Sequence, residues 1–318
     1  MSTRGTDAAA ADRDFPPAPS RVGGPGGPWG NLLRDLEGSG FGMVHASLDE
    51  WRTQLPPEEE RRELLGRDWE RYSKLAGTHL RERFFATRML IRHTAAVALG
   101  TEPYSLELRY GLNGRVHLRG YDQIDVSLSH TADLLLCGIT SLGVVGIDTE
   151  PANRRLSGQD VERLMCTEPE RRRIARAPEA ERNGRLLSLW TLKEAYSKAL
   201  GQGLRFPFTE FGFRTDDEAG GGAAGGVGGG AAGGAAGGVG GGAAGAASGA
   251  TGRHARLERA DGTLVEDHTW RFATCPVPGG HVAAVALQDT RRSGRPDTRA
   301  STALNRQILA AIKRSMPA

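Results

Sequence analysis

The stretch Val144-Val145-Gly146-Ile147-Asp148-Thr149-Glu150 joins a short apolar run, typical of a buried strand, to two acidic residues. Side chains at positions i and i+2 of a strand point to the same face, so Asp148 and Glu150 are expected to project together. Neighbouring carboxylates repel each other, and a divalent cation such as Mg²⁺ relieves that repulsion, often with the help of phosphate oxygens. The alternative is a solvated strand end, which this short motif taken alone favours.

A second motif, Trp190-Thr191-Leu192-Lys193-Glu194-Ala195-Tyr196-Ser197-Lys198, falls within a segment with a helical pattern. Trp190, Glu194 and Lys198 are successive i,i+4 neighbours and therefore share one helical face. We interpret Trp190 as a packing residue that fixes the helix against a sheet, and we expect Glu194 and Lys198 to extend from the rim. The alternative is an ordinary surface pair between Glu194 and Lys198, worth roughly 0.2–0.5 kcal/mol.

Two further groups of residues are suited to phosphate binding. The sequence Ser127-Leu128-Ser129-His130 ends a predicted strand, where a histidine and small hydroxyls can reach a phosphate. The alternative is a structural or solvated histidine. Arg83, Arg88 and Arg92 include an i,i+4 pair on one predicted helix, a spacing suited to clamping a phosphate. Their alternative is a solvated basic helix face.

Working outward toward the N-terminus, the pattern predicts two helices followed by strands. Apolar residues spaced by three and four predict a first helix from Pro56 through Leu75. Thr78 as N-cap and Gly100 as terminator delimit a second helix. Short runs typical of strands follow at 106–110, 126–128, 134–140 and 144–147.

Toward the C-terminus the helical signal returns. Thr167 and Glu170 are placed as a capping box, and a long helix is expected from about Glu179 to Leu200. Strands are predicted at 206–214, 269–274 and 281–287. The order of helices, strands, helices and strands predicts an α+β protein with two similar halves that meet near residue 145.

Composition sets the boundaries of these halves. Segments rich in Pro, Gly and Ala cannot bury enough apolar surface to offset the entropy lost on ordering. We therefore expect a disordered lead at 1–40 and a flexible Gly/Ala insertion at 219–250. The N-terminal half then covers 41–145, the C-terminal half 146–290, and a tail with one potential helix covers 291–318.

Charge, hydropathy and cysteine content exclude several classes of protein. The 318 residues carry 41 Lys and Arg against 38 Asp and Glu, spread along the chain, so nucleic acid is not an expected partner. No apolar stretch approaches the ~20 residues that span a bilayer, and we expect a cytoplasmic protein without a membrane partner. The three cysteines lack metal-ligand spacing and indicate buried thiols without disulfides.

Taken in order, SLSH, GIDTE and LWTLKEAYSKALGQGL form a combination more specific than its parts. It resembles the 4′-phosphopantetheinyl transferase superfamily, in its large single-chain branch of the surfactin-synthetase-activating type. The resemblance covers roughly residues 81 to 204. It implies two α/β halves related by a pseudo-twofold axis, with coenzyme A bound in the cleft between them.

The resemblance also implies roles for individual residues. Asp148, Glu150 and Glu194 resemble acids that hold Mg²⁺, with Mn²⁺ as an alternative, against the coenzyme A pyrophosphate. Glu194 would also help to take the proton from the acceptor serine, and Lys198 would contact the phosphates. The residues implied to contact the rest of coenzyme A are Ser129, His130, Arg83, Arg88, Arg92, Gly114 and Arg115. The family often has Gly-Lys-Pro where this chain has Gly114-Arg115-Val116, and an arginine fork is not equivalent to a lysine.

The implied enzyme is of the holo-[acyl-carrier-protein] synthase type. It would transfer 4′-phosphopantetheine from coenzyme A to a serine of an apo acyl or peptidyl carrier protein, releasing 3′,5′-ADP without a covalent enzyme intermediate. We expect a monomer that binds coenzyme A and the carrier protein. Two alternatives remain at this point: a metal-dependent phosphohydrolase, and a catalytically silent module that binds carrier proteins or coenzyme A.

Overall fold

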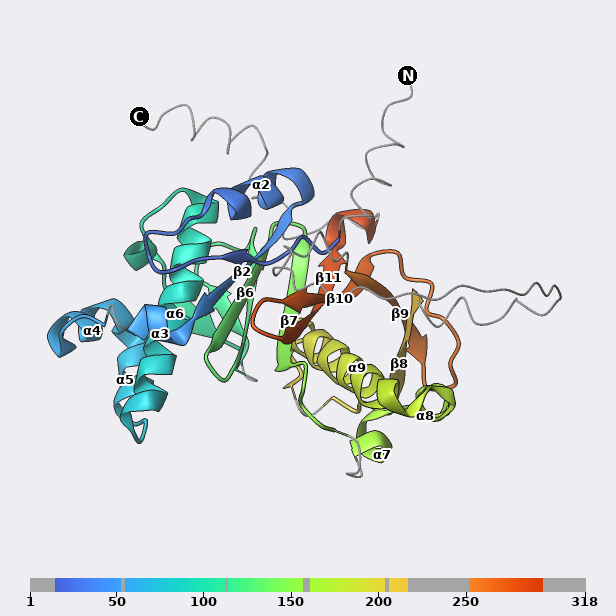
Figure 1. The fold of residues 1–318 in the computed structure, drawn as a ribbon. Coiled ribbons are helices and arrows are strands. Elements are labelled where there is room, and N and C mark those ends of the chain that lie inside the picture. Colours follow the sequence, from blue (N-terminus) through green and yellow to red (C-terminus); the bar gives the residue numbers. More distant parts are fainter. Residues whose placement is uncertain are drawn as a thin grey trace, which may run out of the picture.

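The computed structural model describes residues 15–52, 55–111, 114–156, 161–203, 206–216 and 252–293. Figure 1 shows a mixed α/β protein in which two sheets lie side by side, with one long helix against each. The helix of the first half is α6 (Thr78–Leu99), and that of the second half is α9 (Glu179–Ala199).

The first sheet is built from residues between 20 and 140. Its strand order is β1-β2-β6-β5, with bounds β1 (Ser20–Arg21), β2 (Phe41–Ser47), β6 (Leu134–Thr140) and β5 (Asp125–Thr131). All its pairings are antiparallel except the short parallel contact between β1 and β2. A separate two-stranded ribbon, β3 (Leu108–Tyr110) with β4 (Val116–Leu118), lies before β5 in the chain.

The second sheet is built from the C-terminal half and is antiparallel throughout. Its order is β7-β11-β10-β9-β8, with bounds β7 (Gly143–Pro151), β11 (His281–Asp289), β10 (Trp270–Val277), β9 (Arg253–Arg259) and β8 (Phe211–Thr215). Two shorter helices, α7 (Val161–Met165) and α8 (Glu168–Arg176), connect β7 to α9. Because β7 is an edge strand of this sheet, one side of its backbone faces the first half.

Three apolar cores show how the long helices and the sheets are stacked. One core joins α6 to the first sheet, and a second joins α9 to the second sheet. The third contains alternate residues of β2, β6, β7 and β11, and so lies between the two sheets. In β11, for example, Ala284 and Ala286 belong to the α9 core, whereas Val285 and Leu287 belong to the core between the sheets. The layer order is therefore α6, first sheet, second sheet, α9.

Polar side chains join the edges of the two sheets, along a contact that we call the β5–β7 seam. Alternate residues of β5 point at alternate backbone N–H groups of β7. The three bonds run from Val145 N to Asp125 Oδ2 (2.7 Å), from Ile147 N to Ser127 Oγ (3.0 Å) and from Thr149 N to Ser129 Oγ (3.3 Å). These side chains take the place of a neighbouring strand, and they fix β7 relative to β5.

The prediction of a disordered lead at 1–40 is wrong for residues 15–40. They contain β1 and α2 (Gly30–Ser39), Leu32 is fully buried, and the Phe15 ring lies 5.8 Å from the Phe41 ring. The Pro and Gly content of this segment led to the prediction of disorder, but the segment also contains apolar residues that are buried in the cores. Residues 1–14 lie outside the described part of the chain.

The predicted helix from Pro56 through Leu75 is interrupted. The chain forms α4 (Glu58–Leu65), a 3₁₀ turn (Gly66–Asp68) and α5 (Trp69–Ser73). The break falls at Gly66, whose φ of 53° and ψ of −118° leave the helical region. The next helix, α6, begins at Thr78 itself with Gly77 at the N-cap, and it ends at Gly100 in the left-handed conformation, as predicted.

Several other predictions are confirmed. The capping box of Thr167 and Glu170 is present with both of its hydrogen bonds, and α9 matches the predicted long helix. Strands occur near each predicted run, whereas β2, β4 and β9 were not predicted, nor was α3 (Leu48–Arg52). The three cysteines are buried and unpaired. The Gly/Ala insertion at 219–250 and the potential terminal helix lie outside the described residues.

None of the helices described here is both long enough and apolar enough to cross a lipid bilayer.

Candidate active site

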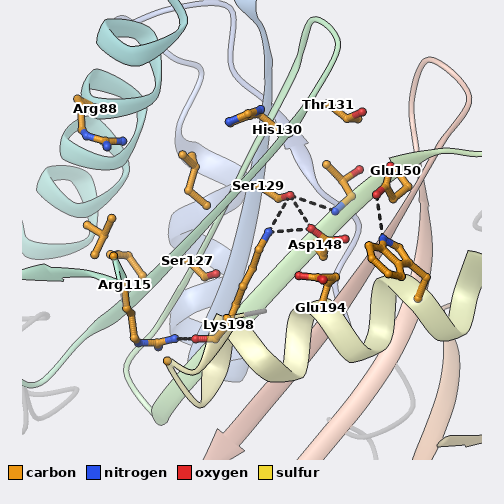
Figure 2. A pocket seen from close by; sticks show the side chains of 18 of the residues that line it. Arg88, Arg115, Ser127, Ser129, His130, Thr131, Asp148, Glu150, Glu194 and Lys198 are labelled. Atoms are coloured by element: carbon orange, nitrogen blue, oxygen red, sulfur yellow. Dashed lines mark hydrogen bonds and ion pairs between the residues drawn. The ribbon is translucent and has the colours of Figure 1, made fainter. Parts of the chain in front are cut away.

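A cavity of about 670 Å³ opens between the two halves beside the β5–β7 seam. Its walls come from β5, β7 and α9, with contributions from α6 and from the turn before β4 (Figure 2). The predicted site residues that line it are Arg88, Gly114, Arg115, Ser129, His130, Asp148, Glu150, Glu194 and Lys198. Residues that are far apart in the sequence therefore meet in one hollow.

Asp148 lies at the centre of a small polar network. Its Oδ1 accepts hydrogen bonds from Lys198 Nζ (2.7 Å) and from Ser129 Oγ (2.9 Å), and Lys198 Nζ lies 3.0 Å from the same serine oxygen. Its Oδ2 is buried and has no hydrogen-bond partner. One carboxylate oxygen is thus held by a cation and a hydroxyl, while the other is available to a ligand.

Glu150 is held differently. Its Oε1 accepts from the Arg154 guanidinium and from Trp190 Nε1, the latter at 3.0 Å. The Trp190 ring also packs edge-on against Phe208, at a centroid distance of 6.0 Å. Trp190 is thus a packing residue, as interpreted from the sequence, and also a hydrogen-bond donor that orients an acid.

Glu194 carries the second unpartnered oxygen of the site. Its Oε1 is buried without a hydrogen-bond partner. Burial raises the pKa of this carboxyl above its ordinary value, and the negative charges of Asp148 and Glu150 raise it further. A cation between Asp148 and Glu194 would relieve both penalties.

The fit of a divalent metal can be judged from these oxygens. In the described part of the chain, no group of three or more His, Cys, Asp or Glu side chains is arranged to hold a metal ion. Two carboxylates do present buried, unpartnered oxygens, Asp148 Oδ2 and Glu194 Oε1. Mg²⁺ is commonly bound by one or two carboxylates together with water and substrate phosphates, so this donor set fits it without a complete protein cage.

A glycine brings these acids together. A Cβ atom on Gly146 would lie 1.9 Å from Ala195 O and 2.5 Å from Ala199 N, both backbone atoms of α9. Only a residue without a side chain lets α9 pack this closely on β7. Glu194 and Lys198 consequently stand beside Asp148.

A cationic wall faces the acids. Partial desolvation lowers the pKa of His130, and the positive charges of Arg83, Lys198 and Arg88 lower it further. The Arg88 guanidinium lies over the Phe84 ring, 4.3 Å from its centroid. Acids at one end and cations at the other form a cavity suited to a polyanion that carries a metal.

Comparison with known proteins finds matches to part of this chain. A model of the 4′-phosphopantetheinyl transferase superfamily matches residues 144–228, which include all of β7 but its first residue and the whole of α9. This part of the chain is thus similar to that superfamily. Its match to the 4′-phosphopantetheinyl transferase HetI of Nostoc sp. is 28% identical over 127 residues, 39% of this chain and 54% of the relative.

Two further relatives agree. A 4′-phosphopantetheinyl transferase of Bacillus subtilis is 25% identical over 138 residues, covering 41% of this chain and 57% of the relative. A phosphopantetheinyl transferase of Thraustochytrium sp. is 32% identical over 154 residues, covering 44% and 53% respectively. The chain thus spans about half the length of the curated relatives that it matches.

Two of the arginines predicted to bind coenzyme A lie outside the cavity wall. Arg83 does not line it, although its charge acts on His130. Arg92 is 5% exposed, and its guanidinium donates to the backbone oxygens of Leu64 and Leu65 beside a separate small hollow. The structure therefore does not bring Arg92 to the site, because its side chain points toward α4 instead.

Sequence reasoning missed one residue of the site, Arg154, and one buried charged residue outside the cavity, Lys193. Arg154, which binds Glu150, carries no motif signal. Lys193 is fully buried, where it pairs with Glu170 at 2.8 Å and donates to the backbone oxygens of Met165, Phe208 and Phe211. A signal for Lys193 did exist: it stands seven residues after Leu186 and four after Leu189, on the apolar face of α9.

Proposed function

We propose that this chain transfers the 4′-phosphopantetheine group of coenzyme A to a serine of an apo acyl or peptidyl carrier protein. The observation that carries the proposal is the meeting of Asp148, Glu194 and Lys198 at one end of a cavity with cations at the other. The superfamily match over 144–228 covers the strand and helix that supply those three residues.

The reaction is balanced as a direct displacement. The serine oxygen attacks the β-phosphorus of coenzyme A, a new P–O bond forms, and the bond to 3′,5′-ADP breaks. The serine proton passes to the Glu194 carboxylate, whose raised pKa suits a proton acceptor. Lys198, aimed at the acids from α9, neutralises charge on the phosphates and on the departing nucleotide.

A bound Mg²⁺ ion would add charge neutralisation at the pyrophosphate. Asp148 and Glu194 would hold it with their unpartnered oxygens. Glu150, engaged by Arg154 and Trp190, would contribute mainly negative charge beside the ion. Mn²⁺ can serve in the same oxygen-rich site.

His130 and Arg88 are proposed to face the 3′-phosphate of coenzyme A, with Arg83 acting on them through its charge. Ser129 belongs to the acidic end instead, since its hydroxyl donates to Asp148 and receives the Thr149 N–H. The chain is proposed to belong to the large single-chain branch, with a pseudo-twofold axis between its halves. In support, one chain carries two pairs of a long helix and a largely antiparallel sheet.

The test is intact mass spectrometry of a panel of apo carrier proteins incubated with this chain, coenzyme A and Mg²⁺. We expect a gain of one phosphopantetheine mass on at least one carrier, and loss of that gain in EDTA. Cleaved coenzyme A without a carrier adduct would instead indicate a phosphohydrolase. Intact coenzyme A and unchanged carriers, with carriers from several pathways tested, would indicate a silent binding module.

A further inference from the structure

Arg115 lines the cavity, yet its guanidinium is directed into the protein. It donates to the backbone oxygen of Lys198, to Val145 O at 3.0 Å and to the Asp125 carboxylate. The Arg115 side chain is 12% exposed and that of Asp125 14%. Figure 2 shows Arg115 reaching the end of α9, on the far side of the cavity from His130.

The Arg115 guanidinium meets Lys198 at the C-terminal end of α9. The last carbonyl groups of a helix lack partners within the helix and carry partial negative charge, so a cation is favourable there. Lys198 O also receives the Gly201 N–H at 3.0 Å. A Cβ on Gly201 would lie 3.3 Å from Arg115 Cδ, so the stem of the arginine packs against this turn as well.

Asp125 anchors the arginine in the β5–β7 seam. Its Oδ2 receives the Val145 N–H at 2.7 Å as well as the Arg115 guanidinium. Burial raises the pKa of this carboxyl, and the charge of Arg115 opposes that rise. The pair Asp125–Arg115 therefore connects β5, β7 and the end of α9 in one network.

Lys198 is consequently held at two points. Arg115 binds its backbone oxygen, while its ammonium is bound by Ser129 and Asp148. We propose that Arg115 is a positioning residue that fixes Lys198 for the transfer reaction and makes no contact with the nucleotide of coenzyme A. This inference rests on the proposed function, and it departs from the nucleotide contact expected from the sequence at Gly114-Arg115.

The experiment compares Arg115→Met, Arg115→Lys and Asp125→Asn with the wild-type chain, using coenzyme A and 3′-dephospho-coenzyme A as substrates. Misplacement of a reacting group by about 1 Å costs on the order of 100-fold, so we expect Arg115→Met to lower kcat by roughly 10- to 100-fold. The KM for coenzyme A should stay within about twofold, since no substrate contact is removed. The ratio of kcat/KM between the two substrates should match that of wild type.

The two conservative variants separate positioning from substrate contact. Arg115→Lys keeps the charge but cannot reach three acceptors in a fork, so kcat should recover only in part. Asp125 does not line the cavity, and Asp125→Asn should nevertheless lower kcat at constant KM because it loosens Arg115. This variant also serves if Arg115→Met fails to fold.

Two outcomes would overturn the inference. One is an Arg115→Met chain with unchanged kcat and a KM for coenzyme A raised about tenfold or more, which is the pattern of a lost substrate contact. The other is an Asp125→Asn chain with wild-type kcat. A wild-type chain that transfers nothing contradicts the proposed function. Such a chain would also overturn the positioning role, and calorimetric titration with coenzyme A would then decide only whether Arg115 contacts the nucleotide, since weaker affinity of Arg115→Met would show that contact.

Discussion

The two long helices meet their sheets in different ways. α6 packs through large side chains, and the residues of β6 in its core are Leu135, Cys137 and Ile139. α9 lies on β7 at backbone contact, where Gly146 leaves no room for a Cβ. The groups proposed for chemistry stand on α9, whereas Arg88 of α6 reaches the cavity through a long side chain. Close packing of the α9 and β7 backbones thus positions the groups proposed to react. Arg88, proposed to face the substrate, is instead brought to the cavity by the length of its side chain.

Because α9 and β7 are in backbone contact at Gly146, we predict that no side-chain atom can be added to this residue without separating them. Gly146→Ala should force α9 away from β7 and cost about 3 kcal/mol or more, because both clashing partners are backbone atoms. Chemical denaturation and the yield of soluble protein measure this. Gly184→Ala is the matched control, since nothing lies within 4 Å of its added Cβ on α9. The control should gain about 0.5–1 kcal/mol. Equal stability of the two variants would contradict the packing argument.

The next largest effect concerns the acid on α9. Glu194→Gln keeps the shape of the side chain but removes the proposed proton acceptor, and transfer should fall by roughly 10²- to 10⁴-fold. The free energy of unfolding should not fall, because the variant removes a buried charge that Asp148 and Glu150 repel. Carrier-loading rates and denaturation curves test the two statements separately. Near-normal turnover would remove Glu194 from the proposed mechanism.

α6 carries a buried titratable residue, His93, which has no part in the proposed reaction. His93 lies among the rings of Trp29, Trp51 and Tyr104, and burial lowers its pKa from about 6.5 to about 4. The unfolded chain then binds more protons between pH 6.5 and pH 4, so stability falls as the pH drops through this range. Between pH 7 and pH 5 this component amounts to about 2 kcal/mol. His93→Phe should remove it, as denaturation of both chains at the two pH values will show.

The smallest effect separates two arginines of α6. Arg88 lines the cavity, and Arg88→Met should raise the KM for coenzyme A by about tenfold, the equivalent of one charged hydrogen bond. Arg92→Met should leave that KM unchanged and lower the free energy of unfolding by about 1–3 kcal/mol, because its bonds to Leu64 and Leu65 are lost. A shared effect of both variants on KM would show that the whole helix face meets the substrate.

The contrast between Arg88 and Arg92 also shows how far the sequence can predict this site. Helical spacing placed both on one face, but it could not show that Arg92 would turn to α4, which is distant in the sequence. The motif containing Asp148 and the motif containing Glu194 and Lys198 were found because their spacing is local. That they meet depends on Gly146, whose role appears only when α9 packs on it.

The fold was predictable to a similar degree. Thr167 and Glu170 define the start of α8 through contacts within one turn, so the sequence sufficed. α2 and β2 were missed because they rest on residues such as Leu32 and Phe41, whose partners are distant in the chain. Lys193 was missed because a lysine in an apolar stripe is buried only when four acceptors converge on it.

The β5–β7 seam has a consequence for behaviour in solution. The outer edge of a sheet exposes unpaired N–H groups that can recruit a strand from another molecule. In β7 three of these groups are already occupied by side-chain oxygens of Asp125, Ser127 and Ser129. The same oxygens that hold the two halves in register therefore also protect this edge against intermolecular β-pairing and aggregation.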